Sequence, residues 1–156
     1  MTVIAGFPGV GKSSLAGALA RDIESTEYKW SSAGVVSDEW PKNYIKQIES
    51  ADAYGLLALV STHAEVRDAL SRARIDWYLC YPSRECRSEY LQRYARRGSP
   101  AAFLDLLAGQ WDAWIDEMES ESRMIQALVL RPSEYLSDRV KLLSSGTAID
   151  NVEVTR

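Results

Sequence analysis

The feature that most constrains this chain is a glycine-rich segment close to its amino terminus. Residues 6–13 are Gly-Phe-Pro-Gly-Val-Gly-Lys-Ser, which matches the pattern G-x-x-x-x-G-K-S, and they follow a short apolar run at residues 1–5. A strand, a glycine-rich turn and a helix in this order are the context in which the pattern forms a Walker A phosphate loop. The segment therefore predicts an α/β fold built on a parallel sheet.

Each residue type in this segment suits the binding of a phosphate group. Glycines at positions 6, 9 and 11 let the main chain curl so that several N–H groups point at one spot. A helix starting near Lys12 adds the partial positive charge of its N-terminus. We expect Lys12 to reach the β- and γ-phosphates of ATP and the hydroxyl of Ser13 to bind Mg²⁺. The expected ATP site comprises Gly6, Phe7, Pro8, Gly9, Val10, Gly11, Lys12, Ser13 and Ser14.

Length and composition indicate one domain over residues 1–156, with no repeats or internal boundary. The net charge of −4 argues against a broad surface for nucleic acid but leaves room for a local basic site. No apolar run reaches the ~20 residues of a membrane span, and we expect no signal peptide. Cys80 and Cys86 lack a zinc or disulfide pattern, and Cys80 is expected in the core. These features favour a cytoplasmic protein.

Two acidic residues are candidates for a general base. After the loop we expect a helix over about 12–20, with Leu15 and Leu19 on its inner face, and then a short strand ending at Glu24. An acid at that strand end can accept the proton of an attacking hydroxyl. Asp38 competes with it, because residues 34–36 also resemble a strand end. The alternative for each is a solvated surface carboxylate.

Residues 28–54 mix aromatic and small polar residues and are predicted to form an acceptor-binding excursion. Trp30, Trp40 and Tyr44 could stack on a base, although aromatic side chains more often serve packing. Pro41 suits the first turn of a helix that we expect to run to about Ala51.

Residues 55–61 form a continuous apolar run, which predicts a central strand covered on both faces, and residues 75–81 are predicted to form the fourth strand. The first of these segments ends in Ser61-Thr62-His63, and ligands of such sheets bind beyond the carboxyl ends of strands, so Ser61 and His63 are expected to face the site. The acidic residue of a Walker B motif is absent there. Arg67, in a helix over 64–72, is placed to reach a phosphate or to form a surface ion pair.

Residues 83–100 are predicted to form an arginine-bearing helical lid, closed by Gly98. Arg93 and Arg97 lie four apart on one face, and Arg96 is adjacent to Arg97. Such arginines can close on a triphosphate and neutralise the charge that moves to the transferred group. The structural alternative is a favourable interaction with the helix dipole.

The remaining chain supplies a core helix over about 99–120, with an apolar stripe that includes Trp111 and Ile115, and a fifth strand over 124–130. Arg131 follows this strand, where adenine often packs in this architecture. A last helix is expected over about 133–143, with a tail or terminal strand after it.

Taken together, these segments resemble small phage-encoded P-loop kinases of the adenylate-kinase type. The resemblance rests on G-F-P-G-V-G-K-S (6–13), I-E-S (23–25), Y-K-W (28–30), W-P-K-N-Y-I (40–45), V-S-T-H-A-E-V-R-D-A-L (60–70) and Y-L-Q-R-Y-A-R-R-G (90–98). The arginine segment is also similar to the lid of phage polynucleotide kinase, R-x-x-x-R-G. The resemblance implies a five-stranded parallel sheet in the order 2-3-1-4-5. It also implies that Arg93 and Arg97 contact ATP phosphates and that an acid after the second strand is the general base.

The activity implied is transfer of the γ-phosphoryl group of ATP to a hydroxyl of a nucleic acid or nucleoside. Some phage kinases of this type phosphorylate 5-hydroxymethyluracil in DNA, and this acceptor is favoured, with a polynucleotide 5′-hydroxyl or a deoxynucleoside monophosphate as alternatives. A monophosphate needs arginines to clamp it, and residues 28–54 contain none, which leaves Arg67 as the main candidate. A nucleotide-hydrolysing switch lacks support because no N-K-x-D motif is present, and the intact Lys12 and Ser13 count against an inactive module.

Overall fold

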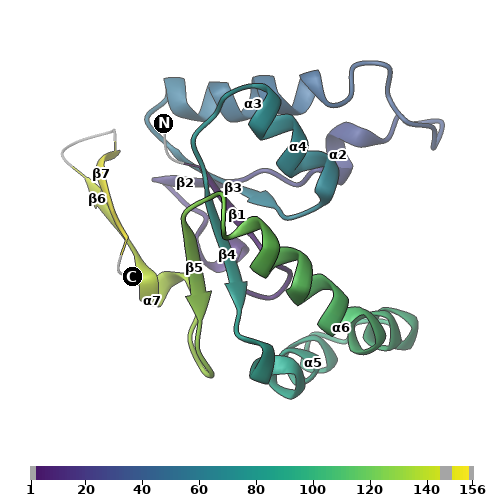
Figure 1. Ribbon diagram of the computed structural model, residues 1–156. Helices are drawn as coiled ribbons and strands as arrows, with labels where there is room; N and C mark the ends of the chain where they lie inside the picture. The colour runs from purple at the N-terminus through teal and green to yellow at the C-terminus, as the bar shows by residue number, and fades with distance from the viewer. Residues whose placement is uncertain (1–2, 145–148, 155–156) are drawn as a thin grey trace.

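A five-stranded parallel sheet forms the centre of the protein, in the order β2-β3-β1-β4-β5 (Figure 1). The computed structural model describes residues 3–144 and 149–154. Strands β1 (Val3–Gly6), β3 (Leu57–Ser61) and β4 (Tyr78–Pro82) are interior, and β2 (Ala20–Asp22) and β5 (Ala127–Leu130) form the edges. Every neighbouring pair is parallel. The predicted fold class and strand order are therefore confirmed.

The interior strands are apolar throughout because helices cover both faces of the sheet. Ile4, Leu59 and Leu79 are fully buried. Helix α3 (Lys42–Ala53) packs against β3 and helix α6 (Ala101–Glu121) packs against β4. The remaining helices are α1 (Lys12–Leu15), α2 (Thr26–Lys29), α4 (Ala64–Arg72), the 3-10 turn Arg84–Cys86, α5 (Arg87–Arg96) and α7 (Leu136–Arg139).

Two predicted helices are wrong in extent. The expected helix over 12–20 stops at Leu15, because the main chain at Leu19 and at β2 is used for pairing with β3; Leu19 O accepts from Leu57 N–H at 3.0 Å. The expected helix over 133–143 ends at Arg139, and its last residues form β6 (Val140–Ser144), antiparallel to β7 (Ile149–Val154). In both places, pairing with another strand outweighs local helical propensity.

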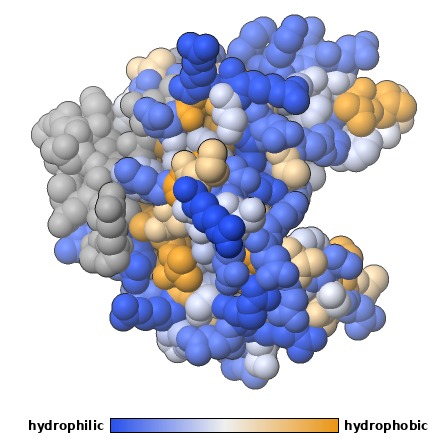
Figure 2. Space-filling view, viewed as in Figure 1, coloured by the Kyte–Doolittle hydropathy of each residue, from blue (hydrophilic) through white to orange (hydrophobic). Residues whose placement is uncertain are grey.

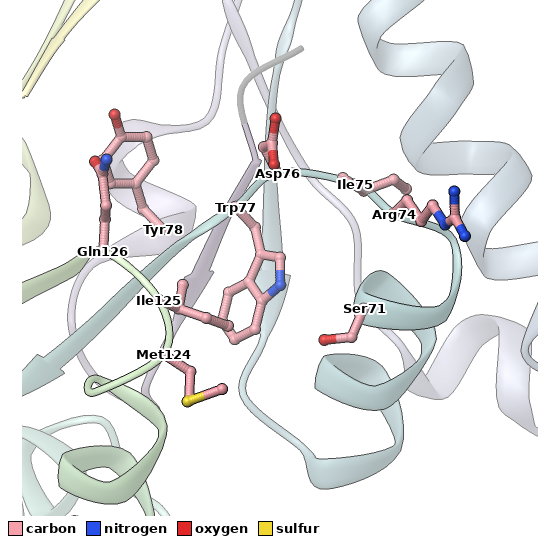
Figure 3. A pocket seen from close by; sticks show the side chains of 9 residues that line it. All are labelled: Ser71, Arg74, Ile75, Asp76, Trp77, Tyr78, Met124, Ile125 and Gln126. Carbon is pink, nitrogen blue, oxygen red and sulfur yellow. The ribbon is translucent and has the colours of Figure 1, made fainter.

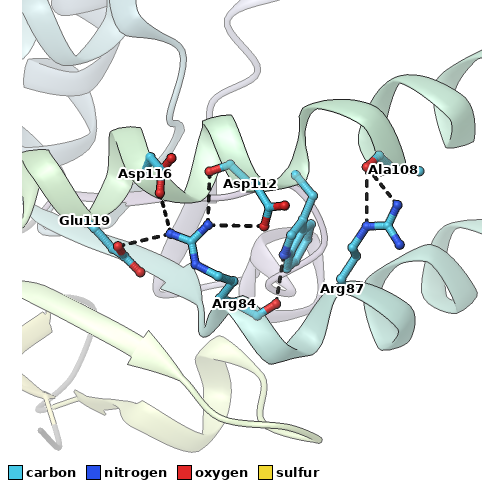
Figure 4. Close-up of polar contacts among 7 residues, drawn as sticks. Arg84, Arg87, Ala108, Asp112, Asp116 and Glu119 are labelled. Atoms are coloured by element: carbon cyan, nitrogen blue, oxygen red, sulfur yellow. Dashed lines mark hydrogen bonds and ion pairs between the residues drawn. The ribbon is translucent and has the colours of Figure 1, made fainter.

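Helix α6 contacts the start of α5 and the turn before it through Arg84 and Arg87. Arg84 contacts the carboxylates of Asp112, Asp116 and Glu119, three residues on one side of α6 (Figure 4). The side chain of Arg87 donates to Ala108 O at 3.0 Å. These contacts hold the arginine-rich helix α5 alongside α6.

The carboxyl ends of the parallel strands bring the loops after β1, β2, β3 and β4 to one edge of the sheet. In the space-filling view the molecule is notched between the region of α2 and α3 and the region of α5 and α6 (Figure 2). Of the helices in the described part of the chain, none combines the length and the apolar character needed to span a bilayer.

Candidate functional site

The Gly6–Ser13 loop is held in a fixed shape by contacts behind it. Phe7 N–H donates to Cys80 O at 2.8 Å, and the Phe7 ring packs edge-on against Trp111 and Trp114 of α6. Gly9 has a φ of 86°, and a Cβ there would lie 3.1 Å from the ring of Tyr90. The loop therefore requires glycine at this position for both its backbone conformation and its packing.

The inner side of the loop presents main-chain donors. Within the described residues, the N–H groups of Gly11, Lys12 and Ser13 donate to no protein acceptor. Lys12 Nζ donates to Gly6 O at 2.8 Å. Burial lowers the pKa of Lys12, an effect opposed by the carboxylates of Asp22 and Glu24. Because α1 is only four residues long, these donors and the Lys12 ammonium supply the positive potential, and the helix dipole adds little.

A cavity of about 360 Å³, the loop cavity, lies in front of these donors. It collects charged residues from three separate parts of the chain: Lys12 from the loop, Asp22 and Glu24 from the end of β2, and Arg97 from the end of α5. The full lining is Gly6, Pro8, Gly9, Gly11, Lys12, Ser13, Asp22, Glu24, Ser61, Thr62, His63, Tyr94, Arg97 and Phe103. An anion and a hydroxyl group can thus meet cations and carboxylates in one space.

Two carboxylates, rather than one, stand at the end of β2. Asp22 is the last residue of the strand and Glu24 follows two residues later. Burial raises the pKa of Asp22, Lys12 opposes this rise, and Asp22 Oδ1 lies buried with no hydrogen-bond partner among the described residues. Sequence analysis missed Asp22 because it placed the strand end at Glu24. Asp38 is exposed and does not line the loop cavity.

The end of β3 adds polar groups to the same cavity. Ser61 Oγ lies 3.2 Å from Ser25 Oγ, and Ser25 Oγ lies 3.5 Å from His63 Nδ1. Both Ser61 and His63 line the loop cavity, as expected from their position after an interior strand.

Three arginines near the end of α5 have different surroundings: Arg93 and Arg96 lie in the helix, and Arg97 follows directly after it. Arg97 is exposed and lines the loop cavity. Arg93 is buried beneath the loop, where it donates to Gly9 O at 2.9 Å, to Glu134 O at 3.0 Å and to Glu89 Oε1 at 2.9 Å. Arg96 is exposed and outside the cavity lining. In this conformation Arg93 supports the loop from behind, and Arg97 faces the space in front of it.

Several sequence candidates do not reach the loop cavity. Tyr44 is fully buried and its hydroxyl donates to Ile23 O at 2.7 Å, so no ring face is open for stacking. Trp40 packs on Tyr44, and its Nε1 donates to Glu65 at 2.9 Å. Trp30 is 48% exposed on the excursion, outside the cavity lining.

Arg67 and Arg131 also lie elsewhere. Arg67 is buried and forms ion pairs with Glu121 at 2.7 Å and Glu117 at 3.4 Å, while its Nε donates to Thr62 O. The ion-pair alternative considered for Arg67 therefore describes its contacts. Arg131 is exposed, and its main-chain N–H donates to Glu134.

A larger cavity, about 730 Å³, opens at the opposite edge of the sheet, near the amino ends of β4 and β5 (Figure 3). Trp77, Ile125 and Met124 line it together with Arg74. Among the described residues that line it, Asp76 is the single carboxylate and no residue of the Gly6–Ser13 loop is present, so this cavity lacks the combination of groups found in the loop cavity. Burial raises the pKa of Cys80 to about 12 and keeps this thiol protonated in the core, as predicted.

Metal-binding groups are sparse. In the described parts of the chain, no three His, Cys, Asp or Glu residues gather as a metal cluster. The Ser13 hydroxyl and the Asp22 and Glu24 carboxylates share the loop cavity, and oxygen donors of this kind suit Mg²⁺ that also binds phosphate oxygens.

No protein-family model matches the chain, and no curated protein matches it in sequence.

Proposed function

We propose that the protein is an ATP-dependent kinase that transfers the γ-phosphoryl group to a hydroxyl of a nucleoside or nucleic acid. The observation that carries this proposal is the composition of the loop cavity. Gly11, Lys12, Ser13 and Arg97 line the same cavity as two carboxylates, and the N–H groups of the three loop residues are not used by a protein acceptor in the described part of the chain. Phosphoryl transfer requires such positioning and charge neutralisation more than it requires covalent chemistry by the protein.

Each group has a distinct role in this proposal. The loop N–H groups and Lys12 hold the β- and γ-phosphates, and Arg97 neutralises charge on the transferred group. Ser13 and one of the two carboxylates would hold Mg²⁺, which supplies charge neutralisation between the phosphates. The oxygen of the acceptor hydroxyl forms a bond to Pγ, and the other carboxylate takes the proton that this hydroxyl loses. The bond from Pγ to the β,γ-bridging oxygen breaks, and ADP leaves.

The favoured acceptor is the hydroxymethyl group of 5-hydroxymethyluracil in DNA, as in the phage kinases that the sequence resembles. A base in a duplex must be flipped out or met in single-stranded DNA. A polynucleotide 5′-hydroxyl and a free deoxynucleoside monophosphate are the competing acceptors. A phage origin and a site of action in the host cytoplasm belong to the same proposal.

A transfer assay with ATP labelled in the γ-phosphate tests the proposal. The acceptors are DNA containing 5-hydroxymethyluracil, an oligonucleotide with a free 5′-hydroxyl, and deoxynucleoside monophosphates. Label on one acceptor class, abolished by Lys12→Ala, supports a kinase. Label on none of them, with Lys12-dependent ATP hydrolysis intact, would overturn the proposal and favour a hydrolytic switch.

The same assay separates the carboxylates. Asp22→Asn and Glu24→Gln should each reduce turnover, and the general base should lose turnover far more than ATP affinity. Asp38→Asn should have little effect, since this residue lies outside the loop cavity.

A further inference from the structure

A second cavity adjoins the loop cavity and is referred to here as the side cavity. Its volume is about 400 Å³, which lies within the ~300–1,000 Å³ typical of small-molecule sites. It shares Pro8, Thr62 and His63 with the loop cavity. A molecule in the side cavity would therefore lie directly beside a molecule held by the Gly6–Ser13 loop.

The inner wall of the side cavity is apolar and aromatic. It is formed by Phe7 from the loop and by Trp114 and Met118 from α6. Phe7 and Met118 are each 2% exposed, whereas Trp114 is only partly buried. The Phe7 and Trp114 ring centroids lie 6.2 Å apart at 69°. A partly exposed indole fixed by such packing offers a surface on which a flat ring can stack.

The charged groups at the rim are already paired. Lys29, at the end of α2, forms an ion pair with Glu65 on the first turn of α4. Hydrogen bonds from Lys29 and Trp40 lower the pKa of Glu65, so this carboxylate is ionised and holds the lysine. Across the cavity, Glu117 lies 3.4 Å from the Arg67 guanidinium, which also pairs with Glu121.

This charge arrangement selects against a phosphate. Among the described residues, Lys29 and His63 are the basic side chains that line the side cavity, and two carboxylates, Glu65 and Glu117, line it as well. A phosphate monoester dianion placed there would meet no uncommitted lysine or arginine and would be repelled by Glu117. Burying an unpaired dianion is strongly unfavourable, whereas an uncharged ring loses little on entering.

We propose that the side cavity is the acceptor site of the kinase and that it takes an uncharged planar ring bearing the hydroxyl, stacked on Trp114. Any phosphate of the acceptor stays outside this cavity. The inference rests on the kinase function proposed above and names the acceptor class. It also moves the stacking surface to helix α6, since Trp30, Trp40 and Tyr44 of the predicted excursion, residues 28–54, do not line the side cavity. Lys29 is the residue of the excursion that lines it.

The first experiment measures acceptor affinity directly. Binding of 5-hydroxymethyl-2′-deoxyuridine and of its 5′-monophosphate to the protein saturated with ADP and Mg²⁺ is followed by calorimetry. We expect the uncharged nucleoside to bind at least as tightly as the monophosphate. Trp114→Ala should weaken nucleoside binding about tenfold, within the ~1–3 kcal/mol that stacking on an aromatic side chain contributes. ADP affinity should not change.

Trp114→Phe keeps a flat ring at this position and should retain most of the nucleoside affinity. It therefore shows whether the loss in Trp114→Ala comes from the missing ring or from misfolding. Leu106→Ala is the matched control, because Leu106 is an exposed apolar residue of the same helix that does not line the cavity. If Trp114→Ala and Trp114→Phe both bind the nucleoside like the parent, the stacking site is refuted.

A charge variant provides a gain of binding that misfolding could not produce. Glu65→Gln removes the partner of Lys29 and leaves a lysine free at the rim, so affinity for the monophosphate should rise about fivefold to tenfold while nucleoside affinity stays constant. Tighter binding of the monophosphate by the parent protein, with no gain in Glu65→Gln, would overturn the inference. That result would leave the kinase function standing, because Lys12-dependent label transfer to a monophosphate would still be observed.

Discussion

Arg93 is the residue whose removal gives the sharpest test of how the loop is held. Its side chain is 7% exposed and donates to Gly9 O, Glu134 O and Glu89 Oε1. Its guanidinium carbon lies 4.5 Å from the Tyr90 ring centroid and 3.8 Å from that of Tyr135. Arg93→Ala removes these interactions and leaves two main-chain carbonyls without their donor.

The expected cost follows from these contacts. Each hydrogen bond to a charged group contributes about 1.5–3 kcal/mol, and removing one partner of a buried pair costs about 3–5 kcal/mol. Glu89 is partly exposed and can regain water, which favours the lower end. We therefore expect Arg93→Ala to lower the free energy of unfolding by about 3 kcal/mol. For a chain of this length, that corresponds to a fall in Tm of about 6–12 °C.

The Gly6–Ser13 loop should also become less ordered, because the carbonyl of Gly9 would no longer be held by Arg93. Urea unfolding measures the change in stability, and the affinity for ATP reports the change in the loop. Arg93→Lys, with a single ammonium, should recover only part of both. Arg96→Ala, an exposed change on the same helix, should shift stability by no more than about 0.5 kcal/mol. An Arg93→Ala protein within 1 kcal/mol (about 2–4 °C in Tm) of the parent would refute this account.

Three further predictions concern single residues. Tyr44→Phe removes the buried hydrogen bond to Ile23 O and should cost about 1–2 kcal/mol of stability, measured by urea unfolding; an unchanged midpoint would contradict this. Burial raises the pKa of Asp22, so its ionised form is less favourable in the folded than in the unfolded protein. The stability associated with Asp22 is thus present at acidic pH and lost as the pH rises through its raised pKa, and Asp22→Asn should raise Tm at pH 7 by more than at about pH 4, the ordinary range of an aspartate. A gain in Tm that does not depend on pH would exclude this explanation. Gly11→Ala introduces a Cβ at a φ of 97°, 3.1 Å from the Tyr135 ring, and should cost about 1–3 kcal/mol and weaken ATP binding in a titration; parent-like stability and affinity would show that this position does not require glycine.

The pattern within a segment was enough to predict its structure where that structure depends mainly on the segment's own residues. The interior strands could be found because burial on both faces demands unbroken apolar runs, such as residues 57–60. Helix α4 (Ala64–Arg72) was predicted with its observed bounds, since its apolar positions repeat at helical spacing. The Gly6–Ser13 loop could be located because its glycines are required by the backbone itself.

Pairing between strands could not be predicted from the pattern of one segment alone. The end of β2 is set by its register with β3, where Asp22 lies beside Leu59, and nothing in residues 20–24 alone distinguishes Asp22 from Glu24 as the strand end. Likewise, residues 140–144 form a strand only because residues 149–154 lie against them. The omission of Asp22 from the predicted candidate bases follows from the first of these.

The sequence by itself determined the interior strands of the sheet, the glycine loop and the set of arginines near residue 95, because each can be recognised within a short stretch of chain. Only the tertiary structure decided which side of the loop each arginine occupies. Arg93 is drawn beneath the loop by the carbonyls of Gly9 and Glu134, which lie far from it in sequence, whereas Arg97, one helical turn later, faces the loop cavity. The physical reason is that a buried guanidinium needs hydrogen-bond acceptors, and folding alone brings these distant carbonyls together around it.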